Sequence, residues 1–289
     1  MTYETADALR TALEHRLGNY SHEMEVSLDR LRRRVLFERI IARLQSAEPG
    51  SWVVKGGMAL EVRLRDDARL TKDLDLGLRE SKFDPEELRE RLIDALGEDP
   101  DDDRFVMTVG KIKRCTDDGQ GHSSCRVSVS ANLAGRPFGV LKLDVSPRAH
   151  ELDATVFMEL PNTLAFAGIG TRDIEIIDIH RHAAEKLHAM QKDFGDRENS
   201  RVRDLIDLVI LREHDLLDPD ELRSAVWRVW QEREQAAPPD SLPAFPATWP
   251  DRYEAAAAEL GLGTLSFADA TSITAVTWNG VTARKDPIT

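Results

Sequence analysis

The stretch that decides the fold is Ser51–Glu80, SWVVKGGMALEVRLRDDARLTKDLDLGLRE. A short apolar run at Trp52–Val54 predicts a strand. The pair Gly56-Gly57 permits backbone geometry that residues with side chains avoid, and the apolar residues that follow, up to Leu64, predict a short helix. A strand, a glycine turn, a helix and a second strand therefore form one local unit, on which the rest of the chain builds.

The segment Lys72–Leu78 closes this unit with strict alternation of polar and apolar residues, which is typical of a strand. Period two places Asp73 and Asp75 on one face. Two carboxylates held that close repel each other unless a cation neutralises them. Mg²⁺ is the expected cation, with Mn²⁺ in its place as an alternative, because carboxylates and substrate phosphates are its usual ligands. The start of the preceding helix would offer backbone N–H groups to those phosphates. A solvated acidic face of an edge strand is the structural alternative.

Composition narrows the class of protein. The chain has 289 residues and a net charge of −13, with 41% hydrophobic and 31% charged residues, which suits a globular protein and excludes one that is basic all over. Cys115 and Cys125 lack the spacing of metal ligands, and neither a signal peptide nor an apolar run of membrane-spanning length is present. We expect a protein of the reducing cytoplasm that has no membrane partner.

The first 48 residues have the apolar spacing of two helices. The second helix carries a cluster of arginines, Arg30, Arg32, Arg33 and Arg34. Such a cluster in an acidic chain is either a solvated helix face or a patch that contacts the phosphate backbone of RNA.

Further strands are predicted after a helix that runs from Pro85 to about residue 96. Residues 105–116 and 124–133 are expected to form strands joined by a hairpin loop at 117–121. A turn is expected at 135–137, and 140–146 alternates as a strand does. Asp144 is thereby a third strand carboxylate, opposite an apolar face. Three such acids on neighbouring strands would make a two-metal cluster chemically sensible.

From residue 161 the composition shifts to helix. The apolar stripe that starts at Ile179 contains Lys186, and a lysine on an inward face needs a partner. Either its ammonium reaches water at the rim of the stripe, or it is a cation aimed at a triphosphate or at the acids. A phosphate-binding lysine predicts that Lys186→Met folds normally and loses activity. The histidines nearby, His180, His182 and His188, are interpreted as ordinary polar residues.

The next helix, Arg201–Leu211, is apolar around nearly its whole circumference, so it is expected to be buried. It nevertheless contains Arg203, Asp204 and Asp207. Arg203 and Asp207 are spaced i, i+4, which predicts either a structural ion pair or a contribution to a site. After a further helix, the proline-rich segment 235–250 is expected to cross the surface as a connection.

Taken in order, several of these motifs resemble those of a known family. The matching stretches are Lys55–Leu60, Arg69–Leu76, Phe166–Gly168, Ala184–Ala189 and Glu198–Asp207. They resemble the AbiEii-type nucleotidyltransferase toxins of type IV toxin–antitoxin systems, within the DNA polymerase β-like superfamily, and the resemblance spans roughly residues 35–280.

The resemblance implies an α/β (α+β) fold with a polymerase β-like nucleotidyltransferase core and a mixed sheet. We expect this core in residues 1–160 and a helical C-terminal domain in 161–289 that completes the active site. The implied activity is Mg²⁺-dependent transfer of nucleotides from an NTP to the 3′ acceptor end of tRNA, which blocks translation. A cognate antitoxin protein is the implied partner.

Site residues follow from the resemblance position by position. It implies that Asp73, Asp75 and Asp144 are the metal ligands, and that Lys186 binds phosphate while the helix with Arg203, Asp204 and Asp207 completes the site. The superfamily's first motif is usually Gly-Ser, whereas this chain has Gly-Gly, so a serine contact to phosphate is missing. The nucleotide-binding residues implied are Lys55, Gly56, Gly57, Arg69, Thr71, Lys186 and Arg203.

Other functions are compatible with the same residues. A protein with this fold could transfer nucleotides to another protein or to a small molecule. Alternatively, the chain could be a non-catalytic module that binds an NTP or the antitoxin. The acid pair Asp73/Asp75 argues against the non-catalytic module. Asp144 and Asp207 both stay open as the base that deprotonates the attacking hydroxyl.

Overall fold

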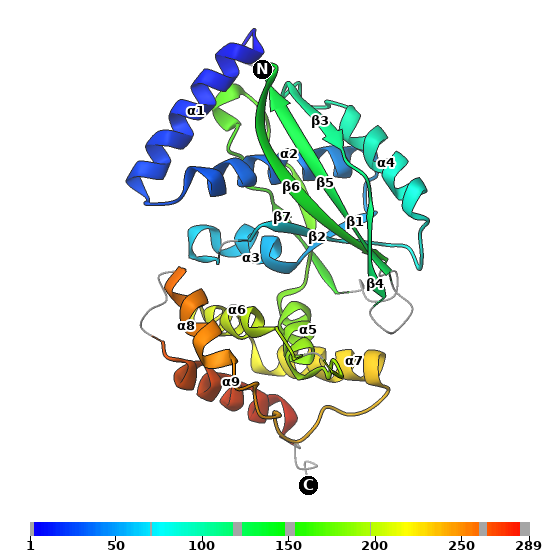
Figure 1. Cartoon of the computed structure of the whole chain (residues 1–289), viewed down its shortest axis with the longest axis vertical. Coiled ribbons are helices and arrows are strands. Elements are labelled where there is room, and N and C mark those ends of the chain that lie inside the picture. Colours follow the sequence, from blue (N-terminus) through cyan, green and yellow to red (C-terminus); the bar gives the residue numbers. More distant parts are fainter. Residues whose placement is uncertain are drawn as a thin grey trace. The chain divides into compact units, whose positions relative to one another are not determined.

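The computed structural model describes residues 3–69, 71–117, 123–147, 154–196, 198–259 and 265–283, without side-chain detail at 113–117, 123 and 259. The chain forms two compact units, unit 1 (Met1–Ile177) and unit 2 (Asp178–Thr289), shown in Figure 1. The units divide later than the boundary after residue 160 that the sequence predicts, because a strand that ends at Ile177 belongs to the sheet of unit 1. Residues 118–121 of the expected hairpin loop lie outside the described residues.

Two helices open unit 1, as the apolar spacing predicts: α1 (Ala6–Glu23) and α2 (Leu28–Ala47). Each begins at a hydroxyl cap, Thr5 for α1 and Ser27 for α2, whose side chain accepts a hydrogen bond from a backbone N–H of the first turn. The capped α2 runs through the middle of unit 1, where its apolar face joins the main core.

The order predicted for the central stretch is confirmed by β1 (Trp52–Lys55), α3 (Gly56–Leu64) and β2 (Asp73–Leu78), with a short 3₁₀ helix, η1 (Arg65–Asp67), after α3. β1 and β2 pair antiparallel. The helix α4 (Pro85–Gly97) follows, capped by Asp84 with proline in its first turn.

Strands of unit 1 form one mixed sheet. After β2 come β3 (Phe105–Val109), β4 (Lys113–Asp117), β5 (Ser123–Leu133), β6 (Arg136–Pro147), β7 (Thr155–Glu159) and β8 (Asp173–Ile177). Among the described residues the order is β3-β5-β6-β2-β1-β8-β7, and β4 pairs with β5 beside this path. β2 runs parallel to β6 and β1 parallel to β8, so the sheet is mixed, as predicted.

Three details of the strand prediction are wrong. The expected strand 105–116 is split into β3 and β4 by the irregular residues 110–112, although the Gly110 N–H still donates to Ser128 O of β5 at 2.8 Å. The turn expected at 135–137 lies at Ala134 and Gly135, both with positive φ, so β6 already begins at Arg136. The strands β7 and β8 fall in segments for which no strand was predicted.

The two faces of β2 have opposite characters, as its alternation predicts. Leu74, Leu76 and Leu78 are buried in a core shared with α2 and α4. Strands β6 and β5 alternate in the same way, and their apolar side chains, such as Leu143 and Val127, belong to the same core. The polar residues of these strands therefore lie on the other face of the sheet.

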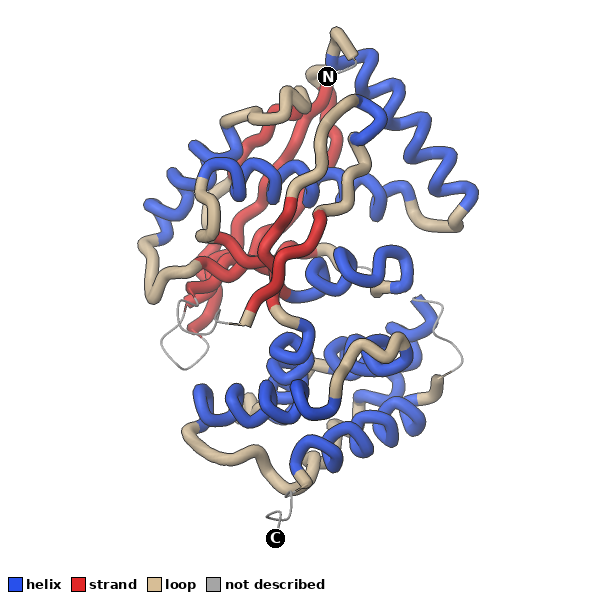
Figure 2. The backbone as a smooth tube through the Cα atoms, turned by 180° about the vertical axis from the view of Figure 1, so that it is seen from behind, coloured by secondary structure: helices blue, strands red, loops and turns tan. Residues whose placement is uncertain are grey.

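Unit 2 consists of helices and connecting segments, as Figure 2 shows. The helices are α5 (Ile179–Gln191), α6 (Val202–Glu213), α7 (Pro219–Glu234), α8 (Trp249–Glu259) and α9 (Phe267–Thr282). The core includes Leu187 of α5, Ile206 of α6 and Trp278 of α9, and the proline-rich segment before α8 is irregular, as predicted. Within the described residues, no helix has the length and apolar character needed to span a membrane.

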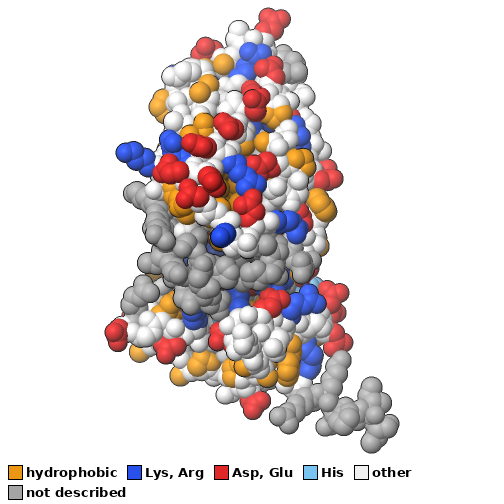
Figure 3. Space-filling view, turned by 90° about the vertical axis from the view of Figure 1, so that its right-hand side faces the viewer, with side chains coloured by type: hydrophobic (Ala, Val, Ile, Leu, Met, Phe, Trp, Pro, Cys, Tyr) orange, Lys and Arg blue, Asp and Glu red, His pale blue; other side chains and the backbone are white. Residues whose placement is uncertain are grey.

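Two arginines of the α2 cluster, Arg30 and Arg34, are held by acids of the same unit, which argues against both a solvated face and an open phosphate-binding patch at these two positions. Arg34 binds Glu61 of α3 at 3.2 Å and Asp66 of η1 at 2.8 Å, and Arg30 binds the same Glu61 at 3.3 Å. The Arg34 side chain is only 10% exposed and that of Glu61 5%. Two further arginines pair with Glu14 and Asp29: Arg32 and Arg33. Figure 3 likewise shows basic side chains among acidic ones on one face of the molecule.

Because this network joins α2 to α3, we expect Arg34→Met to destabilise unit 1 by about 1–3 kcal/mol, the usual effect of leaving a buried charged partner unsatisfied. Arg136→Met is the matched control, because its pair with Asp7 is 59% and 79% exposed and should contribute little. Urea unfolding measured by circular dichroism compares the two variants, and equal midpoints would contradict a structural role of Arg34.

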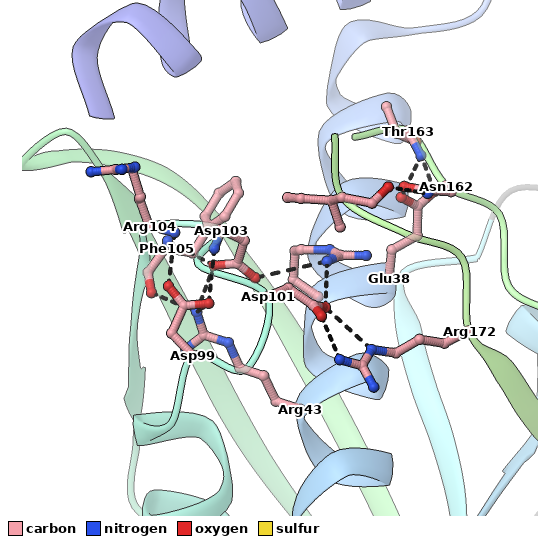
Figure 4. A network of polar contacts seen from close by, with 12 residues as sticks. Glu38, Arg43, Asp99, Asp101, Asp103, Arg104, Phe105, Asn162, Thr163 and Arg172 are labelled. Carbon is pink, nitrogen blue, oxygen red and sulfur yellow. Dashed lines mark hydrogen bonds and ion pairs between the residues drawn. The ribbon is translucent and has the colours of Figure 1, made fainter. Parts of the chain in front are cut away.

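A buried carboxyl group lies on the same helix. Glu38 is fully buried, and its two oxygens accept from the backbone N–H (2.8 Å) and the hydroxyl (2.7 Å) of Thr163 (Figure 4). Burial raises the pKa of Glu38 from 4.5 to about 7. Asp101 and Asp103, by contrast, are bound by Arg39, Arg43 and Arg172 in the neighbouring network.

The raised pKa of Glu38 makes a pH-dependent contribution to the free energy of unfolding. Because the folded state holds the proton up to about pH 7 and the unfolded state releases it near 4.5, this contribution favours folding below pH 4.5 and is lost as the pH rises to 7. Glu38→Gln keeps the shape and removes the titration. Its unfolding free energy relative to wild type should therefore rise by roughly 3 kcal/mol between pH 4.5 and pH 8. Parallel pH profiles of the two proteins would contradict this.

Candidate active site

One row of charged residues crosses the polar face of the sheet. In the strand register, Lys55 of β1 is opposite Asp75 of β2, Asp75 is opposite Asp144 of β6, and Asp144 is opposite Arg126 of β5. Register partners share a face, and neighbouring strands are about 4.8 Å apart. The row therefore holds two acids at its centre and a base at each end. Asp73, two positions from Asp75, lies on the same face.

Asp73 has an unusual environment for a carboxylate. Its side chain is 36% exposed, yet its Oδ1 atom is buried without a hydrogen-bond partner. A buried carboxylate oxygen without a donor is costly, which marks a position where a ligand is expected. A divalent cation would satisfy this oxygen and relieve its repulsion with Asp75. The residues present therefore fit a hard metal ion.

Two glycines at the start of α3 let the backbone approach these residues. Gly56 has φ of +60°, and a Cβ atom there would lie 1.8 Å from Oδ2 of Asp75. A Cβ atom at Gly57 would lie 2.7 Å from Oγ1 of Thr71. The Gly-Gly pair thus has a steric reason: the Thr71 hydroxyl already lies beside the place that a side chain at the second position would enter.

We expect Gly56→Ala to be severely damaging, because the methyl group would displace the Asp75 carboxylate and φ is unfavourable for alanine. Stability should fall by about 1–2 kcal/mol or more, and any activity that depends on Asp75 should fall with it. Gly97→Ala is the control, since nothing lies within 4 Å of its added Cβ atom in α4. Melting temperatures equal to that of wild type in both variants would contradict the close approach of Gly56 to the Asp75 carboxylate.

Asp144 is engaged by an arginine. Nε of Arg126 donates to Oδ1 at 2.7 Å and Nη2 donates to Oδ2, which is a two-point pair. Within the described residues, no group of three or more His, Cys, Asp or Glu side chains is arranged to hold a metal ion. The carboxylates Asp73 and Asp75 therefore form the metal-fitting part of the face, and a metal role for Asp144 stays a prediction.

Other residues predicted to bind the nucleotide surround the start of α3. Thr71 is buried and its hydroxyl donates to Asp73 O at 3.3 Å. Nη2 of Arg69 would lie 3.4 Å from a Cβ atom at Gly57. Lys55 immediately precedes α3 and is 9% exposed. These side chains and the two glycines are thus close to the helix start, where backbone N–H groups bind anions well.

In unit 2, Lys186 is buried and paired with acids of the next helix. Its Nζ donates to Asp204 Oδ1 at 3.0 Å and to Asp207 Oδ2 at 2.7 Å, and Arg201 also binds Asp204. The side chains of Lys186, Asp204 and Asp207 are 5%, 5% and 0% exposed, so the lysine does not reach water at the rim. These residues form a buried charge cluster between α5 and α6.

The ion pair expected between Arg203 and Asp207 is wrong, because Arg203 is exposed and buried Asp207 accepts from Lys186 instead. Two histidines also have specific roles that the sequence did not indicate. His180 Nε2 accepts from the Asp218 N–H at 3.0 Å, and His188 binds Glu234 at 2.6 Å. Both contacts join α5 to α7 or its cap.

The predicted site residues therefore fall into two groups. Lys55, Gly56, Gly57, Arg69, Thr71, Asp73, Asp75 and Asp144 belong to unit 1. Lys186, Arg203, Asp204 and Asp207 belong to unit 2. Arg126, which binds Asp144, was not predicted from the sequence, because its role depends on the register of β5 against β6.

The fold is that of solved nucleotidyltransferases. A protein from H. pylori that is assigned as a nucleotidyltransferase is similar with a TM-score of 0.51 and 20% identity, over 89% of this chain and 96% of that one. MenT4, a nucleotidyltransferase toxin from Mycobacterium tuberculosis H37Rv, is similar with a TM-score of 0.50 and 18% identity, over 93% of this chain and 97% of that one. No curated protein matches the sequence.

The sequence itself defines the family. Residues 39–273 match the family described as nucleotidyl transferase AbiEii toxin, type IV TA system. Because this match covers most of the 289 residues, the chain belongs to the AbiEii nucleotidyltransferase toxins. The resemblance of the motifs and the predicted mixed α/β fold are thereby confirmed.

Proposed function

We propose that this protein transfers nucleotides from an NTP to the 3′ acceptor end of tRNA, with Mg²⁺ held by Asp73 and Asp75, and so blocks translation. Membership of the toxin family supports nucleotidyl transfer and a toxin role. The observation that carries the metal assignment is the buried, unpartnered Oδ1 of Asp73 beside Asp75. In this proposal the protein acts in the cytoplasm and a cognate antitoxin neutralises it.

The reaction joins the RNA to a nucleoside monophosphate. The hydroxyl oxygen of the acceptor attacks the α-phosphorus, the bond from that phosphorus to the bridging oxygen breaks, and pyrophosphate leaves while the hydroxyl proton passes to a base. When bound, the metal ion would neutralise charge on the phosphates. Asp73 and Asp75 would hold it, while Thr71, Arg69 and the start of α3 would orient the triphosphate.

An RNA acceptor needs cationic contacts, and the arginines of α2 are occupied by acids of the same unit. We therefore place no RNA contact on Arg30–Arg34. The acceptor has to be tested directly, because transfer to a protein or a small molecule would use the same acids.

The experiment offers the purified protein each of four α-³²P-labelled NTPs with Mg²⁺, in separate reactions with total tRNA, with a cytosolic protein fraction depleted of RNA, and with small metabolites. Label in tRNA that is removed by digestion from the 3′ end is the expected result. Label confined to protein or to small molecules would replace the tRNA proposal with one of the alternatives, and no transfer to any pool would favour the non-catalytic module.

A further inference from the structure

Arg126 is a half-exposed cation on the acid face, which also carries Lys55 and Lys142, and its contacts with the acids indicate a role. Its side chain is 42% exposed, whereas that of its partner Asp144 is 18% exposed. It holds Asp144 through Nε and Nη2, and Nη2 is also 3.8 Å from Oδ2 of Asp73. Arg126 therefore lies between the acid that anchors it and an acid of the proposed metal pair.

The geometry points to Arg126 as the cation that receives the substrate's phosphates, with Asp144 as its anchor rather than as a metal ligand. This inference rests on the proposed function, because it takes a nucleoside triphosphate as the substrate. It assigns the third acid of the face a role different from the one that the resemblance implies.

Three observations support this assignment. Both oxygens of Asp144 accept from Arg126, so using Asp144 as a metal ligand would require that pair to break. The unpartnered oxygen belongs to Asp73, so the atom that a ligand would satisfy is on the acid pair of β2. Phosphates that reach an ion on Asp73 would come within reach of the guanidinium, and arginine matches phosphate oxygens with a fork of donors.

One alternative cation, Lys186, is less suited to this task. Its ammonium is buried and already bound to two carboxylates of its own unit, whereas the Arg126 side chain is 42% exposed. Recruiting Lys186 would leave two buried acids without their partner, which is strongly unfavourable. Moving the half-exposed Arg126 from Asp73 toward a phosphate leaves its pair with Asp144 intact.

The test measures two binding constants that do not depend on turnover. Calorimetry with Mg²⁺-tripolyphosphate gives the affinity for phosphates without a base, and paramagnetic resonance of Mn²⁺ gives the affinity for the metal in the nucleotide-free protein. Arg126→Met should weaken tripolyphosphate binding about tenfold to a hundredfold. Arg126→Lys should fall in between, because it keeps the charge and loses the fork. Arg136→Met, at an exposed pair of the same unit, is the control and should bind as wild type does.

Asp144→Asn separates an anchor from a ligand. If Asp144 only anchors Arg126, Asp144→Asn should change the affinity for Mn²⁺ by about threefold at most. Its affinity for tripolyphosphate should fall, because Arg126 is no longer held in place. The double variant Arg126→Met with Asp144→Asn should bind tripolyphosphate as weakly as Arg126→Met does. Because it removes one charge of each sign, it keeps the test valid if a single variant misfolds.

Two results would overturn the inference: a tenfold loss of Mn²⁺ affinity in Asp144→Asn, or wild-type tripolyphosphate binding by well-folded Arg126→Met. Failure of the proposed function has a different signature. In that case Asp73→Asn would bind Mn²⁺ as tightly as wild type does, whatever Arg126 contributes.

Discussion

Replacing Lys186 by methionine should destabilise unit 2 by about 3–5 kcal/mol. The Lys186 side chain is 5% exposed and its ammonium binds Asp204 and Asp207, so the substitution takes this cation from two buried carboxylates, of which Asp204 is also bound by Arg201. Breaking a buried ion pair from one side has effects of about this size. The structure thus reverses the expectation, based on sequence, that Lys186→Met folds normally.

Tryptophan fluorescence measures this effect well, because Trp227, Trp230, Trp249 and Trp278 all lie in unit 2 and only Trp52 lies in unit 1. Urea unfolding of Lys186→Met is compared with that of Arg228→Met, an exposed position on α7 where we expect a change within about 0.5 kcal/mol. Similar midpoints for the two variants would contradict the structural role of Lys186.

A second variant separates folding from phosphate binding. Lys186→Met combined with Asp207→Asn removes one charge of each sign and leaves Asp204 with Arg201. This double variant should regain much of the lost stability. If it folds and still fails to transfer nucleotides, the Lys186–Asp207 pair acts in function as well as in folding, as the resemblance implies for both residues; recovery of transfer would limit the pair to folding.

The features that sequence predicts well here are local. The alternation in Lys72–Leu78 spans a single strand, so it identified both the strand and the shared face of Asp73 and Asp75 without any knowledge of neighbours. The capped helices α2 and α4 were predictable for the same reason, since their caps and apolar spacing lie within about 20 residues.

The features that sequence did not predict depend on distant partners. Arg34 looks like part of a basic patch until α3 and η1 bring Glu61 and Asp66 against it. The two-point pair of Asp144 with Arg126 depends on the register of β5 and β6, which a single strand's alternation does not reveal. Lys186 and its acids are 18 and 21 residues apart, joined by the packing of α5 on α6.

Strand β8 shows a related difficulty. Its run Ile174–Ile177 is short and includes the charged Glu175, so it has neither the sustained alternation of a half-buried strand nor the length that would distinguish a buried strand from the start of a helix. Only its parallel pairing with β1, through Val54 and Ile176, establishes it as part of the sheet. The boundary between the units follows that pairing and not the shift in composition after residue 160.

The second large effect is expected at the acid pair. Asp75→Asn keeps the size of the side chain that fits against Gly56 and removes the charge that would hold the metal ion. Asp73→Asn does the same at the oxygen that has no partner. Each variant should fold like wild type and lose at least about 10²–10³-fold in transfer rate, because one charged contact to the reacting phosphates is lost. Glu159→Gln at the sheet edge is a control for the loss of a strand charge.

The most direct test of the account measures incorporation of α-³²P-labelled nucleotide by wild type, Asp73→Asn, Asp75→Asn and Glu159→Gln, with circular dichroism and Mn²⁺ binding recorded on the same preparations. The account predicts that wild type and Glu159→Gln label an acceptor, whereas both aspartate variants stay folded, bind Mn²⁺ at least tenfold more weakly and incorporate no more than about 1% of the wild-type label. Wild-type incorporation by folded Asp75→Asn would contradict it.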